Sequence, residues 1–120
     1  MGGQMAFDHE KLDVYQLALD FMAAAGAICD ALPRGTGYLW DQLQRAALSI
    51  VLNIAEGAGK FSGKDKAVFY QRARGSTTEC AAVLDVGCRL KLLEDPICAQ
   101  QKATLERIAQ MLTKLIKVHT

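Results

Sequence analysis

Apolar residues recur at helical spacing along almost the whole chain, and no segment alternates apolar and polar residues for long enough to predict a strand. Prolines and clustered glycines divide the sequence into four helical runs, at about residues 9–32, 38–58, 62–93 and 95–118. Because the connections are short, the sequence predicts an all-α, antiparallel up-down-up-down four-helix bundle. This single domain is expected to span residues 8–120, after a flexible leader at residues 1–7.

Residues that suit helix ends and helix contacts support these boundaries. Asp8 can cap the first run, residues 62–65 resemble a capping box, and Asp95 precedes a proline at the start of the fourth run. Gly75 and Gly87 lie inside the third run, where glycine weakens an exposed helix by about 1 kcal/mol. We therefore expect these two glycines to mark places where another helix approaches closely.

Three of the runs carry one apolar stripe each, which should face the core. In the first run the stripe comprises Leu12, Tyr15, Leu19, Met22 and Cys29. In the third run it comprises Ala67, Tyr70, Ala73, Thr77, Cys80, Leu84 and Cys88. In the fourth run it comprises Leu105, Ile108, Ala109, Leu112, Leu115 and Ile116.

The second run differs, because it is apolar on both sides of a single polar line. That line comprises Arg45, Ser49, Asn53 and Glu56. One flank comprises Leu48, Val51, Leu52 and Ala55, and the other Ala46, Ala47, Ile50 and Ile54. A helix at the surface of a single bundle would expose one of these flanks to water. We therefore expect this helix to be covered on most sides in an assembly, with its polar line hydrogen-bonded.

If the second and third runs pack antiparallel, this polar line would lie against polar residues of the third run. Contacting residues would then pair as Arg45 with Glu79, Ser49 with Ser76, and Asn53 with Arg72. We expect a structural polar seam, with Arg45–Glu79 as a buried or half-buried ion pair. The alternative is a binding or catalytic site with Glu56 as a general base. The seam is favoured because no histidine or nucleophile stands near that glutamate in the sequence.

Composition narrows the class of protein. Hydrophobic residues make up 51% and charged residues 22% of the 120 residues, as in a globular domain. No apolar run approaches the ~20 residues that span a bilayer, and no signal peptide is recognisable, so a cytoplasmic protein without a membrane partner is expected. Four cysteines without a CxxC pair, and two distant histidines, favour free thiols over a metal site.

The net charge is only +1, but its distribution is uneven. Between residues 42 and 75 the chain has six basic and two acidic residues. We assign a candidate nucleic-acid-binding site to Lys60, Lys64, Lys66 and Arg74, whose side chains could meet RNA or DNA phosphates. The alternative is an ordinary solvated turn.

Several motifs resemble one known family. Leu12-Asp-Val-Tyr-Gln-Leu-Ala18, Ser49-Ile-Val-Leu-Asn-Ile-Ala-Glu-Gly57 and Ala73-Arg-Gly-Ser-Thr-Thr-Glu79 resemble motifs of the four-helix-bundle proteins encoded in intervening sequences of bacterial 23S ribosomal RNA genes, and of their free-standing relatives. The resemblance extends from Phe7 to Lys117. Val51 stands where members commonly have proline, which predicts a straighter helix.

The resemblance implies a homo-oligomer, typically a ring of five chains, associated with ribosomal RNA. It carries over no catalytic residue and no cofactor, so a non-enzymatic scaffold is expected. Two alternatives remain: a protein–protein interaction scaffold, or an accessory factor like the basic pentameric bundle of diversity-generating retroelements. The weak net charge of this chain argues against the latter.

Overall fold

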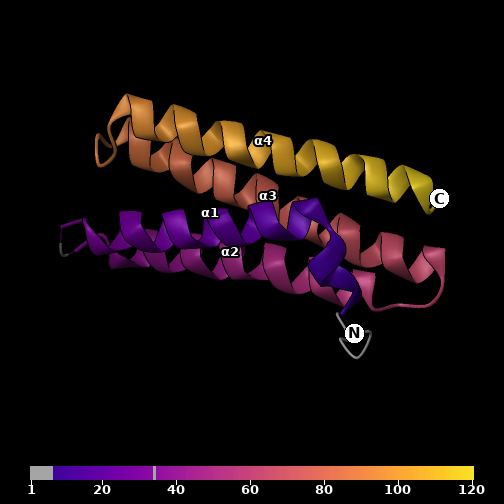
Figure 1. The fold of residues 1–120 in the computed structure, drawn as a ribbon. Coiled ribbons are helices and arrows are strands. Elements are labelled where there is room, and N and C mark those ends of the chain that lie inside the picture. The colour runs from indigo at the N-terminus through magenta and orange to yellow at the C-terminus, as the bar shows by residue number, and fades with distance from the viewer. Residues whose placement is uncertain (1–6, 34) are drawn as a thin grey trace.

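The computed structural model describes residues 7–33 and 35–120, and shows an antiparallel four-helix bundle (Figure 1). A short 3-10 helix, η1 (Asp8–Lys11), precedes the four long helices. These are α1 (Asp13–Asp30), α2 (Gly37–Ala58), α3 (Gly63–Arg89) and α4 (Asp95–Val118). Each packs against its neighbours in sequence, and α1 also packs against α4, which closes the bundle. The predicted fold class is confirmed.

The start of the chain differs from the prediction of one continuous first helix. Leu12 is extended, with φ −92° and ψ 125°, so η1 and α1 are separate elements. Asp8 lies within η1 and does not cap α1, so that prediction was wrong; the carboxylate of Glu10 instead accepts the Phe7 backbone N–H at 2.8 Å. Of the predicted leader, residues 1–6 lie outside the described residues.

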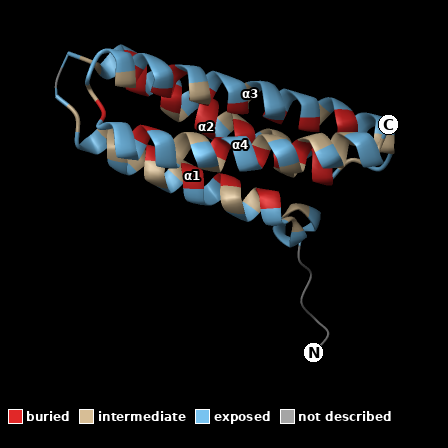
Figure 2. Cartoon of the chain, turned by 90° about the horizontal axis from the view of Figure 1, so that it is seen from above, coloured by how far each residue is buried: buried red, intermediate tan, exposed pale blue. Residues whose placement is uncertain are grey.

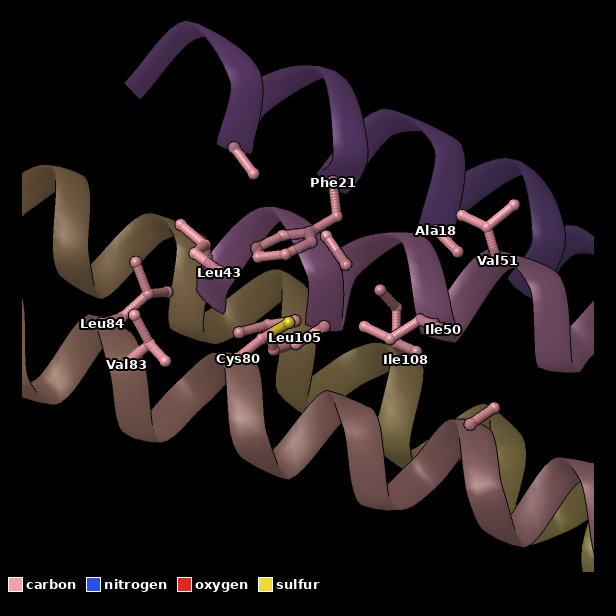
Figure 3. Close-up of a cluster of buried hydrophobic side chains, with 14 of the residues drawn as sticks. Ala18, Phe21, Leu43, Ile50, Val51, Cys80, Val83, Leu84, Leu105 and Ile108 are labelled. Atoms are coloured by element: carbon pink, nitrogen blue, oxygen red, sulfur yellow. The ribbon is translucent and has the colours of Figure 1, made fainter. Parts of the chain in front are cut away.

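Buried side chains form one core along the bundle axis (Figures 2 and 3). Phe21 of α1, Leu43 and Ile50 of α2, Leu84 of α3 and Ile108 of α4 are each no more than 1% exposed. The predicted α3 stripe is buried except for Cys88, which is half-buried. On α4, three members of the predicted stripe are buried and three half-buried, the buried ones being Leu105, Ile108 and Leu112.

The predicted stripe of α1 was wrong by about one residue. The buried residues are Val14, Ala18, Phe21 and Ala25. The predicted set of larger side chains lies at the edges of the core, and Leu19 is 37% exposed. Two of these four residues are alanines, and the larger residues beside them, among them Tyr15 and Met22, are partly buried against the core.

Helix α3 ends earlier than predicted because its C-terminus is closed by backbone hydrogen bonds. The Lys91 N–H donates to the Cys88 carbonyl at 3.0 Å, and the Leu92 N–H donates to the Gly87 carbonyl at 2.9 Å. With Lys91 at φ 61°, this is a Schellman motif. At the other end of α3 the predicted cap is confirmed, since Ser62 Oγ accepts the Asp65 N–H at 3.1 Å.

Two glycines mark close contacts of α3 with α2. A Cβ on Gly57 of α2 would lie 2.9 Å from Tyr70 Cε1, and a Cβ on Gly87 of α3 would lie 2.8 Å from Trp40 Cη2. The prediction for Gly87 is therefore confirmed. It was wrong for Gly75, where an added Cβ would meet nothing within 4 Å.

Replacing Gly57 with alanine should destabilise the bundle. The new methyl must displace the buried Tyr70 ring, and overpacking of this kind costs about 1–3 kcal/mol, more than the ~1 kcal/mol gained in helix propensity. Urea unfolding of Gly57→Ala should therefore give a lower free energy of unfolding. Gly75→Ala is the matched control and should be more stable than the parent by about 0.5–1 kcal/mol. Equal stabilisation of both variants would contradict the close contact at Gly57.

Candidate nucleic-acid interface and polar seam

The centre of the predicted seam is present between α2 and α3. Ser49 Oγ and Ser76 Oγ lie 2.7 Å apart, and both residues are half-buried. Asn53 extends this contact on the same helix, because its Nδ2 donates to the Ser49 carbonyl at 2.9 Å and to Ser49 Oγ at 3.1 Å. These hydrogen bonds satisfy polar groups at the helix interface, where an unpaired hydroxyl would be costly.

The predicted ion pair at the end of the seam is not formed. Arg45 is exposed and lies in no ion pair with Glu79, whose carboxylate instead accepts a hydrogen bond from Gln42 Nε2. Asn53 likewise makes no hydrogen bond with Arg72. Both of these pairings were wrong.

The geometry of an α-helix explains the difference. Successive residues are ~100° apart, so a step of four overshoots a full turn by ~40° and a line at that spacing spirals around the helix. Ser49 and Asn53 lie where the line crosses the interface with α3. Arg45, one step earlier, has turned toward solvent, as has Glu56, which follows Asn53 by only three residues.

Glu56 makes a surface ion pair rather than a site for general-base chemistry. Its Oε2 lies 3.3 Å from Lys60 Nζ, and both side chains are well exposed to solvent. Exposed pairs of this kind contribute little to stability, typically about 0.2–1 kcal/mol.

The two apolar flanks of α2 have different surroundings. Ala46, Ala47, Ile50 and Ile54 are buried in the core. On the opposite flank Val51 is buried, but Leu48 is 46% and Leu52 is 56% exposed. A single chain therefore leaves the second flank partly uncovered, and the expected covering of α2 on most sides is not achieved within one chain.

Three residues of the predicted nucleic-acid-binding site, Lys60, Lys64 and Lys66, lie around the α2–α3 turn, but they are not equivalent. Lys64 is exposed in the first turn of α3. Lys60 pairs with Glu56 and also lies 4.9 Å from the centre of the Phe69 ring. Lys66 Nζ donates to the Ala58 carbonyl at 2.8 Å, so its ammonium group caps the C-terminus of α2.

Arg74 lies two turns of α3 farther along and faces α4. Its Nε donates to Thr113 Oγ1 at 2.9 Å, and it shares a shallow surface hollow with Lys117. The predicted set is thus divided between the α2–α3 turn and the α3–α4 groove.

The fold adds a second basic segment to this end of the bundle. The C-terminus of α4 reaches the start of α3, where an added Cβ on Gly63 would lie 3.3 Å from the His119 carbonyl oxygen. The Tyr70 and His119 rings lie 6.0 Å apart at the same place. The C-terminus of α4 therefore lies at the same end of the bundle as the α2–α3 turn (Figure 1), and Lys117, two residues before His119, is exposed. We call the surface formed by Lys60, Lys64, Arg74 and Lys117 the basic end.

Sequence reasoning missed the role of Phe69 and the position of Arg72. The Arg72 guanidinium lies 4.8 Å from the centre of the Phe69 ring, with Lys60 4.9 Å from the same centre. Cation–π contacts of this kind contribute about 0.5–1 kcal/mol at exposed sites. Arg72 follows Phe69 by three residues on the same helix, so the sequence could have indicated their contact. The approach of Lys60 to the same ring depends on the turn between α2 and α3.

All four cysteines are free thiols, and two of them have strongly raised pKa values. Burial, with a smaller contribution from Glu79, raises the pKa of Cys80 to about 12. The neighbouring Cys98 thiol, burial and the hydrogen bond from Cys88 Sγ to Asp95 Oδ1 at 3.4 Å raise the pKa of Cys88 to about 12. Both thiols are therefore protonated at neutral pH and are poor nucleophiles.

Neither a metal cluster nor a membrane span is found in the parts of the chain that the structure describes. Over residues 7–33 and 35–120, no three histidine, cysteine or acidic side chains are grouped to hold an ion. None of the described helices is long and apolar enough to cross a bilayer.

Removing the hydroxyl pair of the seam should reveal coupling between its members. Ser49→Ala and Ser76→Ala should each lower the free energy of unfolding by about 1 kcal/mol, since each leaves the other half-buried hydroxyl without its partner. The loss in the double variant should be about 0.5–1 kcal/mol smaller than the sum of the losses in the two single variants. Urea unfolding of all four proteins in a double-mutant cycle measures this difference. Strict additivity would show that the contact does not stabilise the bundle.

Comparison with known proteins agrees with the motifs. Residues 10–114 match the family described as 23S rRNA-intervening sequence protein, a span that begins in η1 and reaches the last turns of α4. No curated protein matches the chain. The family description names no enzymatic activity. The match covers most of the chain and the whole helical core, and the chain therefore belongs to the family of 23S rRNA-intervening sequence proteins.

Proposed function

We propose that this protein is a non-enzymatic, self-associating helical bundle that acts as a scaffold on ribosomal RNA. In this proposal the basic end contacts the phosphate backbone. The observation that carries it is the convergence of two segments distant in sequence, the α2–α3 turn with exposed Lys64 and the C-terminus of α4 with exposed Lys117, at the same end of the bundle. The family to which the chain belongs supports RNA as the partner.

The chemistry of the basic end suits a nucleic acid. Lys64 and Lys117 are exposed, and their ammonium groups are available to displace the counterions of phosphates. Phe61 lies between Lys60 and Lys64, and its side chain is 104% exposed, as in an extended reference chain. An aromatic ring in this position can stack on an unpaired base, which favours loops and single strands over regular duplex.

Self-association is supported by the partly uncovered flank of α2. Leu48 and Leu52 are adjacent on one side of the helix and are about half exposed. Contact with other copies would remove their apolar surface from water. The family resemblance leads us to expect a ring of five chains, and the mass from light scattering measures this number directly. Repetition of the basic end around an oligomer would multiply its affinity for a long RNA.

Reversing two charges at the basic end should weaken RNA binding. Lys64→Glu/Lys117→Glu avoids Lys66 and Arg74, whose side chains make structural hydrogen bonds. Fluorescence anisotropy with a structured ribosomal RNA fragment across a salt series should show weaker binding. The slope of log K against the logarithm of the salt concentration should decrease in magnitude by about two, which is roughly one for each lost phosphate contact.

The matched control is Arg89→Glu/Lys91→Glu, which makes the same change in net charge at the opposite end of the bundle. The control should bind RNA like the parent once its helix content is verified. Equal loss in both variants would mean that only net charge matters, and the basic end would not be an interface. An oligomer that binds no RNA would instead favour a protein–protein scaffold or an accessory factor like that of diversity-generating retroelements.

A further inference from the structure

Helices α3 and α4 lie side by side (Figure 1), and the groove between them contains a hollow near the C-terminus of α4. The hollow has a volume of about 310 Å³ and is lined by Gln71, Arg74, Thr113, Ile116 and Lys117. The first two come from one side of α3 and the other three from one side of α4. These five residues include two cations and no acid.

Two linked hydrogen bonds hold the guanidinium group of Arg74 beside this hollow. Thr113 Oγ1 donates to the Ala109 carbonyl at 2.9 Å, so the hydroxyl proton is already used within α4. The same oxygen accepts the Nε–H of Arg74 at 2.9 Å. Of the five N–H donors of an arginine, the four on Nη1 and Nη2 remain. Over residues 7–33 and 35–120, those four make no hydrogen bond and Arg74 forms no ion pair.

We propose that this hollow binds one phosphate group of the RNA backbone, with Arg74 as the binding residue and Thr113 as the residue that positions it. The inference rests on the proposed function and names one contact within it. The end of a guanidinium presents parallel N–H donors from Nη1 and Nη2, which match two oxygens of a phosphate. Lys117 adds a second positive charge, and the side-chain amide of Gln71 adds further donors.

The charges along the groove favour this hollow over the rest of the groove. The next hollow between α3 and α4 has Glu106 in its lining, whose carboxylate repels a phosphate. Lys102 also lines that hollow, but its ammonium group is paired with Asp85. The positive charge available to a phosphate is therefore concentrated beside Thr113.

The hollow and the α2–α3 turn contact different phosphates in this arrangement. Lys64 precedes Arg74 by ten residues on α3, which is about 15 Å along the helix axis. A single phosphate group cannot bridge that distance. An RNA strand held at both places therefore crosses the basic end, and substitutions at the two places should weaken binding independently.

Conservative variants test the arginine contact without changing the net charge. Arg74→Lys replaces the guanidinium with a single ammonium group and should weaken binding to the ribosomal RNA fragment about tenfold. Thr113→Val removes the acceptor of the Nε–H and should weaken binding roughly threefold, because the guanidinium is no longer held in place. Thr113→Ser keeps the hydroxyl and should rescue the lost affinity. In all three variants the salt dependence should match that of the parent, since no charge is lost.

The matched controls are Arg107→Lys and Thr104→Val on α4. Arg107 is exposed, and Thr104 Oγ1 donates to the Gln100 carbonyl at 3.3 Å, as Thr113 does to Ala109. Neither control residue lines the hollow, so both variants should bind RNA like the parent. Equal losses in the controls and in the variants of the hollow would overturn the inference. If circular dichroism shows that Thr113→Val loses helix content, Arg74→Lys decides alone.

The NMR signal of the Arg74 Nε–H reports on the hollow itself. A short single-stranded RNA should shift this signal in the parent, and should shift it less in Thr113→Val. A signal that moves with inorganic phosphate but not with RNA would mean that the hollow takes only the free ion, which would overturn the RNA contact.

Failure of this inference can be told apart from failure of the proposed function. If the parent binds RNA and both Arg74→Lys and Thr113→Val keep its affinity, the hollow is not a phosphate site, although the proposed function stands. A parent that binds no RNA at any salt concentration would overturn both.

Discussion

Gly57 allows the ring of Tyr70 to lie against the backbone of α2, and Gly87 allows Trp40 to lie against α3 near the other end of the same helix pair. Between these contacts, the hydroxyls of Ser49 and Ser76 meet at 2.7 Å. Three contacts spread along two antiparallel helices fix both their register and their rotation. If one helix presented the next residue to its partner at each of these contacts, it would have to turn by ~100°, and all three pairs would separate.

The rotation of α2 set by these contacts also determines what the helix exposes. With Ile50 and Ile54 turned fully into the core, Leu48 and Leu52 must point outward. One bundle has no further helix with which to cover that side, since α2 already packs between α1 and α3. The exposed leucines are therefore a consequence of the α2–α3 register and not an isolated local feature, and burying them requires another molecule.

The same register brings together the charged groups at one end of the bundle. Lys60 and Arg72 approach Phe69 from two helices, and Lys66 closes the C-terminus of α2. Because these cations have contacts within the chain, the exposed lysines on α3 and α4 are the ones available to a polyanion. The basic end and the half-exposed pair Leu48 and Leu52 on α2 are surfaces with different chemistry.

Local chemistry was sufficient to predict the four helices, the cap at Ser62, the α3 stripe and the Ser49–Ser76 contact, because each depends on spacing within one or two helices. The family was also recognisable from the sequence, since its motifs are continuous strings of residues. The tertiary structure alone decided the buried line of α1, the solvent exposure of Arg45, and the approach of the C-terminus of α4 to the start of α3. These features depend on the rotation of each helix about its own axis and on where distant segments meet. The apolar periodicity of a sequence shows only which broad face of a helix is buried. The exact rotation of the helix is fixed by close packing against its neighbours.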